Sequence, residues 1–337
     1  MKTKIKGRVI SIVIIGICIL LFQTIDLAGA KDPDYPTKPI TLYIGLGAGG
    51  VTDLIARGFG ATAAKYLGQS FIYINKGGAG GTLAATAIMN AKPDGYTLGT
   101  TAPSAVFVAP FSGEASYKDL SGFTMIVNYG NFVYGWTVRS DAPWKTWKEF
   151  IEWAKKNPRA AKIGATGAKS TCSAGFALVQ IEKIEQVEFA FIPFPGGGDV
   201  LSAILGGHIT MSTGSLSAST MPYIQGGKLR ILTYQGTQKA AGYDEIPTLG
   251  ELYDMTPPPD LMGIWGPKGL PEYVLKKLDD AFAKTVKDTD FVNFMKRMHT
   301  PIVYMNRNQM NKYVEENYQK AGEVIKMMMA EEAKKKK

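Results

Sequence analysis

The sequence predicts an α/β protein with two lobes of similar architecture. Apolar, β-prone runs are followed by glycine-rich loops and then by helical patterns, which is typical of parallel sheets with crossover helices. This arrangement occurs twice, in residues 40–102 and again in residues 161–235. The 337-residue chain is also long enough for two or three domains with a sizeable core in each.

The expected elements follow this repeat. In the first occurrence we expect strands at residues 40–44, 71–74 and 97–101 and helices at residues 52–66 and 83–90. An aromatic stretch at residues 123–138 then carries the chain from one lobe to the other. In the second occurrence we expect strands at residues 161–164, 189–192, 209–212 and 229–234 and helices at residues 146–156, 171–184 and 200–205.

Two further helices are expected near the C-terminus, at residues 275–286 and 309–329. The second of these carries apolar residues at helical spacing, which predicts a face packed on the body of the protein. These residues are Met310, Tyr313, Val314, Ala321, Val324, Ile325 and Met328. The terminal lysines at 334–337 form a solvated tail that we expect to be frayed.

Composition excludes several classes of protein. With 45% hydrophobic and 20% charged residues, the chain is neither disordered nor collagen-like. Two cysteines and two histidines are too few for a disulfide-dense scaffold or a four-cysteine zinc site, and we expect no metal and no cofactor. The formal charge of +9 alone is compatible with nucleic acid, a membrane surface or an acidic ligand as a partner.

The first thirty residues have the pattern of a secretory signal peptide. Four basic residues precede an apolar run at residues 9–22, and Ala28-Gly29-Ala30 supplies small residues for cleavage. A membrane anchor is one alternative, but the run is shorter than the roughly 20 residues of a spanning helix. A lipoprotein is another, although Ile17 stands before Cys18 where lipidation needs a small residue. We expect cleavage near Ala30 and a soluble, periplasmic protein.

Most of the positive charge lies outside the expected folded body. Without residues 1–30 and the last four lysines, the formal charge falls from +9 to about +2. This is too little to argue for nucleic acid, and no later apolar run is long enough to span a bilayer.

Four glycine-rich segments stand between a strand and a helix, at residues 47–53, 77–82, 164–171 and 193–198. Glycine lets the backbone approach a ligand closely, and the first amides of a helix have no partner within the helix. Each segment is therefore a possible anion site, and two facing loops would hold a ligand with a carboxylate at each end. The alternative is that the glycines only make tight strand–helix turns.

Two other functions find little support. The segment Gly45-Leu-Gly47-Ala-Gly-Gly50 matches a dinucleotide fingerprint, but the second strand ends in Asn75-Lys76 and not in the acidic residue that holds a ribose. No serine lies in a G-x-S-x-G elbow. Cys172 beside Lys169 is either a thiol with a lowered pKa or a small buried residue, and His208 suits a helix C-terminus. We therefore expect that the protein is not an enzyme.

An ordered set of short motifs resembles the Bug family, the extracytoplasmic solute-binding proteins of tripartite tricarboxylate transporters. The resemblance covers essentially the whole chain after residue 30. Its motifs include Gly49-Gly50-x-x-Asp53, Leu67-Gly68-Gln69, Asn75-Lys76-x-Gly78-Ala79-Gly80-Gly81, Pro93-Asp94-Gly95-Tyr96-Thr97, Gly226-Gly227-Lys228-Leu229-Arg230 and Ile246-Pro247-Thr248-Leu249-x-Glu251.

The resemblance implies a two-lobed, type II-like periplasmic binding fold with two α/β domains, a two-segment hinge and a ligand cleft between the lobes. The expected parts are the signal peptide at 1–30, lobe 1 at 31–132 plus 235–305, lobe 2 at 133–234, a C-terminal helix at 306–330 and a lysine-rich tail at 331–337. We expect a monomer that binds a small organic acid and delivers it to membrane permease subunits. A ligand sensor that signals to a membrane receptor and an exported hydrolase are the alternatives.

The resemblance also implies a ligand site built from the first loop of each lobe and the loops beside it. The expected ligand-binding residues are Gly47, Ala48, Gly49, Gly50, Val51, Thr52, Asp53, Thr101, Ser104, Thr166, Gly167, Lys169, Ser170, Thr171, Gly196, Gly197 and Asp199. Asp199 has two interpretations, as the N-cap of the helix at 200–205 or as a partner for a ligand amino group. The chain departs from the family at Gly45 and Ala48, where prolines are usual, and at Lys169, which adds a cation.

Overall fold

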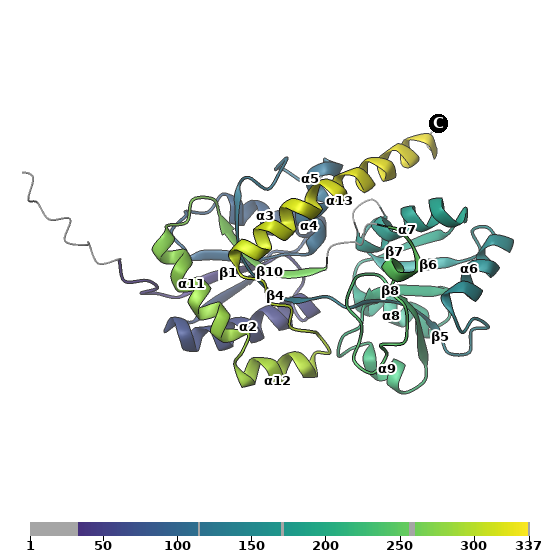
Figure 1. Cartoon of the computed structure of the whole chain (residues 1–337), viewed down its shortest axis with the longest axis horizontal. Helices are drawn as coiled ribbons and strands as arrows, with labels where there is room; N and C mark the ends of the chain where they lie inside the picture. The colour runs from purple at the N-terminus through teal and green to yellow at the C-terminus, as the bar shows by residue number, and fades with distance from the viewer. Residues whose placement is uncertain (1–32, 114, 170–171, 256–259, 336–337) are drawn as a thin grey trace, which may run out of the picture. The chain divides into compact units, whose positions relative to one another are not determined.

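The computed structural model describes residues 33–113, 115–169, 172–255 and 260–335 (Figure 1). The expected signal peptide and the site residues Ser170 and Thr171 lie outside the described residues. The rest of the chain forms two five-stranded sheets, each mixed and each covered by helices.

The first sheet has the strand order β2-β1-β3-β10-β4. Its strands β2, β1 and β3 are parallel, β10 runs antiparallel to them, and the edge strand β4 pairs antiparallel with β10. The strands are β1 (Ile40–Ile44), β2 (Phe71–Asn75), β3 (Thr97–Thr100), β4 (Phe123–Asn131) and β10 (Leu261–Pro267).

The second sheet repeats this plan with the order β7-β6-β8-β5-β9. Again three strands are parallel, the fourth, β5, runs antiparallel to them, and the edge strand β9 pairs antiparallel with β5. The strands are β5 (Tyr134–Arg139), β6 (Lys162–Thr166), β7 (Ala190–Phe194), β8 (Met211–Ser215) and β9 (Leu229–Tyr234). The matching strand orders confirm the two-lobed α/β fold class that the repeated strand–loop–helix pattern predicts.

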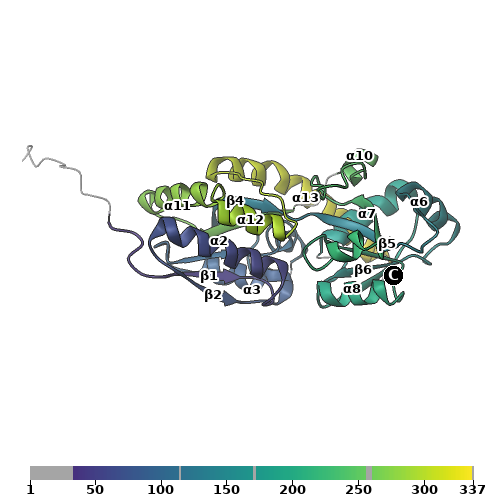
Figure 2. The ribbon, with the colours of Figure 1, turned by 90° about the horizontal axis from the view of Figure 1, so that it is seen from below.

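Helices pack on both faces of the first sheet (Figures 1 and 2). On one face α2 (Val51–Leu67) packs with α11 (Glu272–Thr285) and α12 (Thr289–Arg297) around a cluster of stacked and edge-on rings from Phe59, Tyr129, Phe282 and Phe291. On the other face lies α3 (Thr82–Met89), together with the short α4 (Pro103–Phe107) and α5 (Ala109–Ser112).

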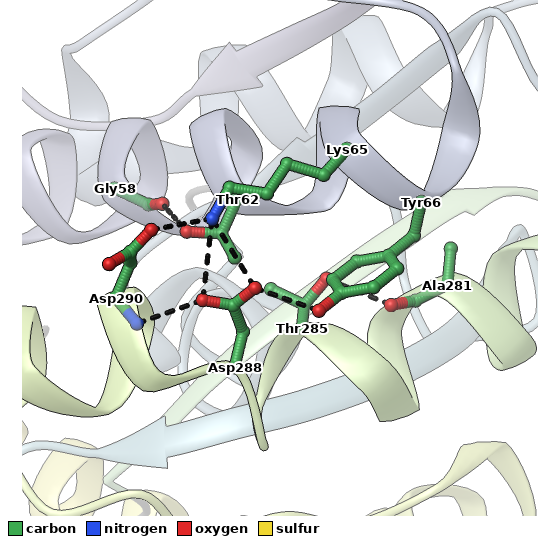
Figure 3. Close-up of polar contacts among 8 residues, drawn as sticks. All are labelled: Gly58, Thr62, Lys65, Tyr66, Ala281, Thr285, Asp288 and Asp290. Atoms are coloured by element: carbon green, nitrogen blue, oxygen red, sulfur yellow. Dashed lines mark hydrogen bonds and ion pairs between the residues drawn. The ribbon is translucent and has the colours of Figure 1, made fainter.

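Polar contacts fasten α2 to the segment between α11 and α12 (Figure 3). Asp288 is the N-cap of α12, and its Oδ1 accepts from the backbone N–H of Asp290 at 2.8 Å. The hydroxyl of Tyr66 donates to Asp288 Oδ2 at 2.7 Å, and Lys65 donates to Asp290 Oδ2 at 2.6 Å. One capping carboxylate thus starts a helix and ties it to α2.

The second sheet has two separate cores, one on each face. The first contains α6 (Trp147–Lys156) and α7 (Ser173–Glu185), with Trp136, Phe150 and Ile163 among its buried residues. The second contains α8 (Gly197–Leu205) and α9 (Met221–Gln225). The remaining short helix, α10 (Leu249–Leu252), begins with a capping box made by Thr248 and Glu251.

The C-terminal helix α13 (Arg307–Lys335) buries the predicted apolar stripe. Six of the seven predicted residues are buried, and Tyr313 is partly buried against the same cluster. That cluster also contains Phe176 and Val179 of α7, so α13 packs on the first sheet and on a helix that covers the second. The helix runs further than predicted, into the lysine-rich end of the chain.

The chain passes from the first sheet to the second between β4 and β5 and returns between β9 and β10. Buried polar contacts join these crossings. The Asn131 side-chain amide donates to Asp260 Oδ1 at 2.9 Å, and the Phe132 N–H donates to the Asp260 carbonyl at 2.7 Å. The Gln235 N–H donates to the Tyr134 carbonyl at 2.9 Å. Hydrogen bonds therefore join the two crossing segments to each other.

Some sequence expectations are wrong in detail. Asp199 is not the N-cap of α8: Gly196 holds that position, and Asp199 is the third helical residue. The strand expected at 209–212 lies at Met211–Ser215. The helix α12 was not expected from the sequence, because its nine residues follow α11 after only a short turn.

Candidate functional site

The first glycine loop lies between β1 and α2, at the carboxyl end of a parallel strand. Gly47, Ala48, Gly49 and Gly50 are exposed, and Gly50 is the N-cap of α2 in an extended conformation without a side-chain cap. The backbone N–H groups of the first helical turn therefore receive no capping side chain. Together with the positive end of the helix dipole, such groups favour an anion.

Asp53 braces this loop from inside. Its side chain is 4% exposed. Its Oδ2 accepts from the Gly49 N–H at 2.8 Å, while its Oδ1 accepts from Arg57 Nε at 2.8 Å and from Asn75 Nδ2 at 2.9 Å. Burial raises the pKa of Asp53, but the hydrogen bonds from Gly49, Asn75 and Arg57 outweigh it, and the pKa lies below its usual value.

Asn75 links the same network to the loop backbone. Its amide also donates to the Leu46 carbonyl at 3.1 Å, and its oxygen accepts from Arg57 at 2.9 Å. Gly49 has a φ of +78°, a conformation that glycine adopts without strain. The conformation of the first loop is therefore fixed by Asp53, Arg57 and Asn75.

Neighbouring loops of the first sheet pack against the first loop. A Cβ on Gly45 would lie 2.8 Å from Thr101 Cγ2. Thr101 can therefore pack this closely only because position 45 has no side chain. A Cβ on Gly81 would lie 3.3 Å from the Gly45 carbonyl. Thr101 itself is 1% exposed, whereas Ser104 is partly exposed in the first turn of α4. The structure thus brings the predicted residues of lobe 1 into one loop group.

The predicted residues of the second sheet form a second group, after the adjacent parallel strands β6 and β7. Thr166 pairs with Phe194 in register, and the Gly167 N–H donates to the Phe194 carbonyl at 3.0 Å. Gly197 and Asp199 are exposed in the first turn of α8, and Gly196 caps it without a side-chain hydrogen bond. A Cβ on Gly47 or on Gly197 would meet nothing within 4 Å.

Lys169, the cation of the second loop group, forms an ion pair with Glu182. Lys169 Nζ donates to Glu182 Oε2 at 2.6 Å, and both side chains are largely buried. Glu182 Oε1 accepts in addition from the Phe189 N–H at 3.2 Å. Arg57, the basic residue in the Asp53 network, is likewise paired with a carboxylate. The unpaired donors that these two loop groups offer to an anion are therefore mainly backbone N–H groups.

Cys172 has a structural role. It is the N-cap of α7, and its Sγ accepts from the Gly175 N–H at 3.3 Å. Burial raises the pKa of the thiol to about 11, against the weaker lowering by backbone N–H groups and Lys169. The sequence-based alternative of a thiol with a lowered pKa is therefore wrong, and the thiol stays protonated at neutral pH.

Comparison with known proteins identifies the family. Residues 55–329 match the model of the tripartite tricarboxylate transporter family receptor, TctC. The chain is also 33% identical over 301 residues to the "UPF0065 protein in gbd 5'region" of Cupriavidus necator, covering 89% of this chain and 90% of the relative. The chain belongs to the TctC receptor family.

Solved structures agree with this assignment. A TctC solute-binding protein from Polaromonas, without ligand, is 29% identical and superposes with a TM-score of 0.70 over 87% of this chain and 99% of that one. The protein MatC from Rhodopseudomonas palustris, with bound malate, shares the fold at 22% identity and a TM-score of 0.73, over 86% of this chain and all of that one.

Membership of the TctC family confirms three sequence-based predictions. The resemblance to Bug proteins is correct, the fold is that of a periplasmic binding protein, and the chain is a solute-binding receptor and not an enzyme. Within the described residues, no helix is both long and apolar enough to cross a membrane. TctC proteins are periplasmic, in agreement with the export signal expected at the N-terminus.

Sequence reasoning missed the residues that support the first loop. Arg57 follows Asp53 by four residues, a spacing that places both side chains on one helix face, and this signal was available. Asn75 is 22 residues from Asp53, and only the pairing of β1 with β2 brings it to the loop. The Lys169–Glu182 pair likewise depends on how the loop folds back along α7.

Proposed function

We propose that this TctC receptor captures a small organic carboxylate between its two lobes and delivers it to a membrane permease. The observation that supports the proposal most concerns the two loop groups: their charged side chains are paired with one another, while the helix N-termini have no side-chain cap. Lys169 and Arg57 are neutralised by Glu182 and Asp53, whereas the first turns of α2 and α8 carry no side-chain cap. Backbone N–H groups at helix N-termini suit carboxylates.

The proposed lobes keep the boundaries expected from the sequence. Lobe 1 consists of residues 31–132 and 235–305, lobe 2 of residues 133–234, and residues 306–330 form a C-terminal helix on the body. The proposed site combines residues 47–53, Thr101 and Ser104 of lobe 1 with the following residues of lobe 2: Thr166, Gly167, Lys169, Ser170, Thr171, Gly196, Gly197 and Asp199. Closure of the lobes on a ligand would exclude water and strengthen each hydrogen bond to the carboxylate.

The carboxylate class is supported by the malate in the related MatC structure. It is supported as well by the two groups of N–H donors, because a dicarboxylate offers one anionic end to each lobe. Residues 1–30 act in this proposal as a cleaved signal peptide, and mass spectrometry of the exported protein should give a chain that begins near Lys31.

A thermal-shift screen tests the carboxylate class. Succinate, malate, glutarate, adipate and citrate are compared with the corresponding amides, which have the same length but no negative charge. A ligand at 100 times its Kd stabilises the folded state by about 2.7 kcal/mol, which is easily detected. Stabilisation by at least one acid and not by its amide is expected. The absence of a shift across a wide acid panel would contradict the proposal.

Uptake measurements test delivery. Once the ligand is known, a strain that lacks this receptor should lose high-affinity uptake of that acid, and uptake should return with the wild-type gene. Normal uptake combined with loss of a transcriptional response to the acid would favour the sensor alternative instead.

A further inference from the structure

A groove on the first sheet lies apart from the glycine loops. It has a volume of about 550 Å³ and runs over β1, β2 and β3 beside α3. Ile72, Tyr43 and Thr97 line its floor, and Ala87 and Ala91 line the α3 side. We call this surface the α3–β2 groove. Thr97 begins β3 and Lys38 precedes β1, so the groove includes the ends of the strands opposite to the loops.

The groove exists because α3 covers only part of this sheet face. The side chain of Ile88 packs over Gly99 of β3, where an added Cβ would lie 2.1 Å away. Over β2 the described part of the chain gives no such cover: Ile72 is 51% exposed, Ile74 is 40% exposed and Leu83 of α3 is 50% exposed. The strand β2 is also the edge of its sheet. Large apolar side chains beside an unpaired strand edge are typical of interaction surfaces.

Two lysines line the groove, and a third lies near Tyr43. Lys38 and Lys92 line it, with Lys38 Nζ 4.5 Å from the ring centre of Tyr96. Lys76 Nζ lies 5.8 Å from the ring centre of Tyr43. Among the described residues, no carboxylate forms an ion pair with any of these three lysines. Asp94 is the one acidic residue in the lining, and its Oδ1 accepts from the Tyr96 N–H at 3.0 Å.

We propose that the α3–β2 groove docks a protein partner through an extended, acidic segment that carries aliphatic side chains. The aliphatic side chains would cover Ile72, the acidic ones would meet Lys38 and Lys92, and the backbone would pair with the free edge of β2. None of the residues that line the groove is fully buried, so the groove is too open to enclose a small molecule. A second copy of this chain would bring like charges together, which disfavours self-association.

The proposal is independent of ligand capture, because Lys38, Ile72 and Lys92 are not among the residues proposed to bind ligand. It is tested with two synthetic peptides and the purified protein. One peptide alternates glutamate with leucine and valine, and the other has lysine in place of each glutamate. Binding is followed by NMR, through the methyl signals of isoleucine and the amide signals of β2 and α3, at low and at high salt.

The glutamate peptide should shift the signals of Ile72 and of β2, and its affinity should fall as salt rises. The double variant Lys38→Glu/Lys92→Glu should weaken this binding at least fivefold. The matched control Lys148→Glu/Lys156→Glu, which makes the same charge change on α6, should bind the peptide like the wild type.

Three outcomes would overturn the proposal. The lysine peptide could bind as well as the glutamate peptide, or the glutamate peptide could leave Ile72 and β2 unaffected. Light scattering could also show a dimer that Ile72→Asp dissociates and that Ile184→Asp, a change at another exposed isoleucine, does not; the groove would then hold a second copy. Thermal denaturation of each variant establishes that it is folded before binding is measured.

Discussion

Lys169 and Glu182 form a 2.6 Å ion pair that belongs wholly to the second lobe. The lysine is one of the residues expected to bind ligand, and the pair gives it a second possible role, which is to neutralise Glu182 beside the loop. A carboxylate left unpaired and 10% exposed next to the proposed anion site would repel the ligand.

A double-mutant cycle separates the two roles of Lys169. Lys169→Met should weaken carboxylate binding about tenfold, which corresponds to ~1.4 kcal/mol, because Glu182 loses its partner. The double variant Lys169→Met/Glu182→Gln should recover most of the affinity, as measured by calorimetry. If the double variant binds as weakly as the single one, Lys169 contacts the anion directly.

Asp53 should be important for both stability and binding. Asp53→Ala removes the acceptor for Gly49, Arg57 and Asn75, and hydrogen bonds to a charged group are worth about 1.5–3 kcal/mol. We expect the free energy of unfolding in urea to fall by about 2–3 kcal/mol and the ligand affinity to fall with it. A variant as stable as the wild type would show that the network does not hold the loop.

The lowered pKa of Asp53 gives the effect a pH dependence. The stabilisation is present above the unfolded-state pKa of about 3.8 and is lost as the pH falls through the lower folded-state pKa. The destabilisation caused by Asp53→Ala should therefore be constant from pH 5 to 8 and decrease only in acid. A decrease already near pH 6 would contradict this account.

Asp260 should contribute to stability with a pH dependence opposite to that of Asp53. It is 3% exposed at the crossing between the sheets, and burial raises its pKa to about 7. Because the folded-state pKa is raised, the contribution of Asp260 to stability is greatest below its unfolded-state pKa of about 3.8 and falls as the pH rises towards 7. Asp260→Asn keeps the shape and the bond from Asn131 but removes the titration, so it should stabilise the protein at pH 8.

The difference between wild type and Asp260→Asn isolates this group from other titrating residues. The stability advantage of the variant, measured by urea unfolding, should grow between pH 4 and pH 7 and then level off. A difference that stays constant over that range would show that Asp260 does not titrate with a raised pKa.

The Asp288 cap should matter more than the neighbouring ion pair. Asp288→Ala removes the N-cap of α12 and the bond from Tyr66, and loss of an N-cap costs about 0.5–2 kcal/mol. Asp290→Ala removes only a contact between two exposed side chains, for which about 0–1 kcal/mol is usual. Thermal unfolding should show the larger decrease in Tm for Asp288→Ala, and equal decreases would contradict the assigned role.

Strands and long helices could be predicted from the sequence because their signals are local. The strands at 40–44 and 229–234 coincide with β1 and β9, and the apolar stripe of α13 was readable from its spacing. The start of α8 was not readable, because three successive glycines give no side-chain signal and a nearby aspartate suggested a cap.

The positions of the loops could be predicted from their glycines, but the side chains that fix the loop conformations could not. The bonds of Asp53 to Asn75 and of Lys169 to Glu182 join residues that are 22 and 13 positions apart. Such contacts depend on strand pairing and on the path of a loop, which a local pattern does not encode. For the same reason the sequence did not reveal that Lys169, a cation expected to bind ligand, is paired with Glu182.

The central claim is that glycine-loop amides of both lobes bind a carboxylate. Isothermal titration calorimetry with the best acid from the screen tests it on Gly47→Val and Gly197→Val, where the new side chain enters open space in each loop. Gly250→Val in α10 is the control. The account predicts at least a tenfold loss of affinity in each loop variant and none in the control. Wild-type affinity in both loop variants would contradict it.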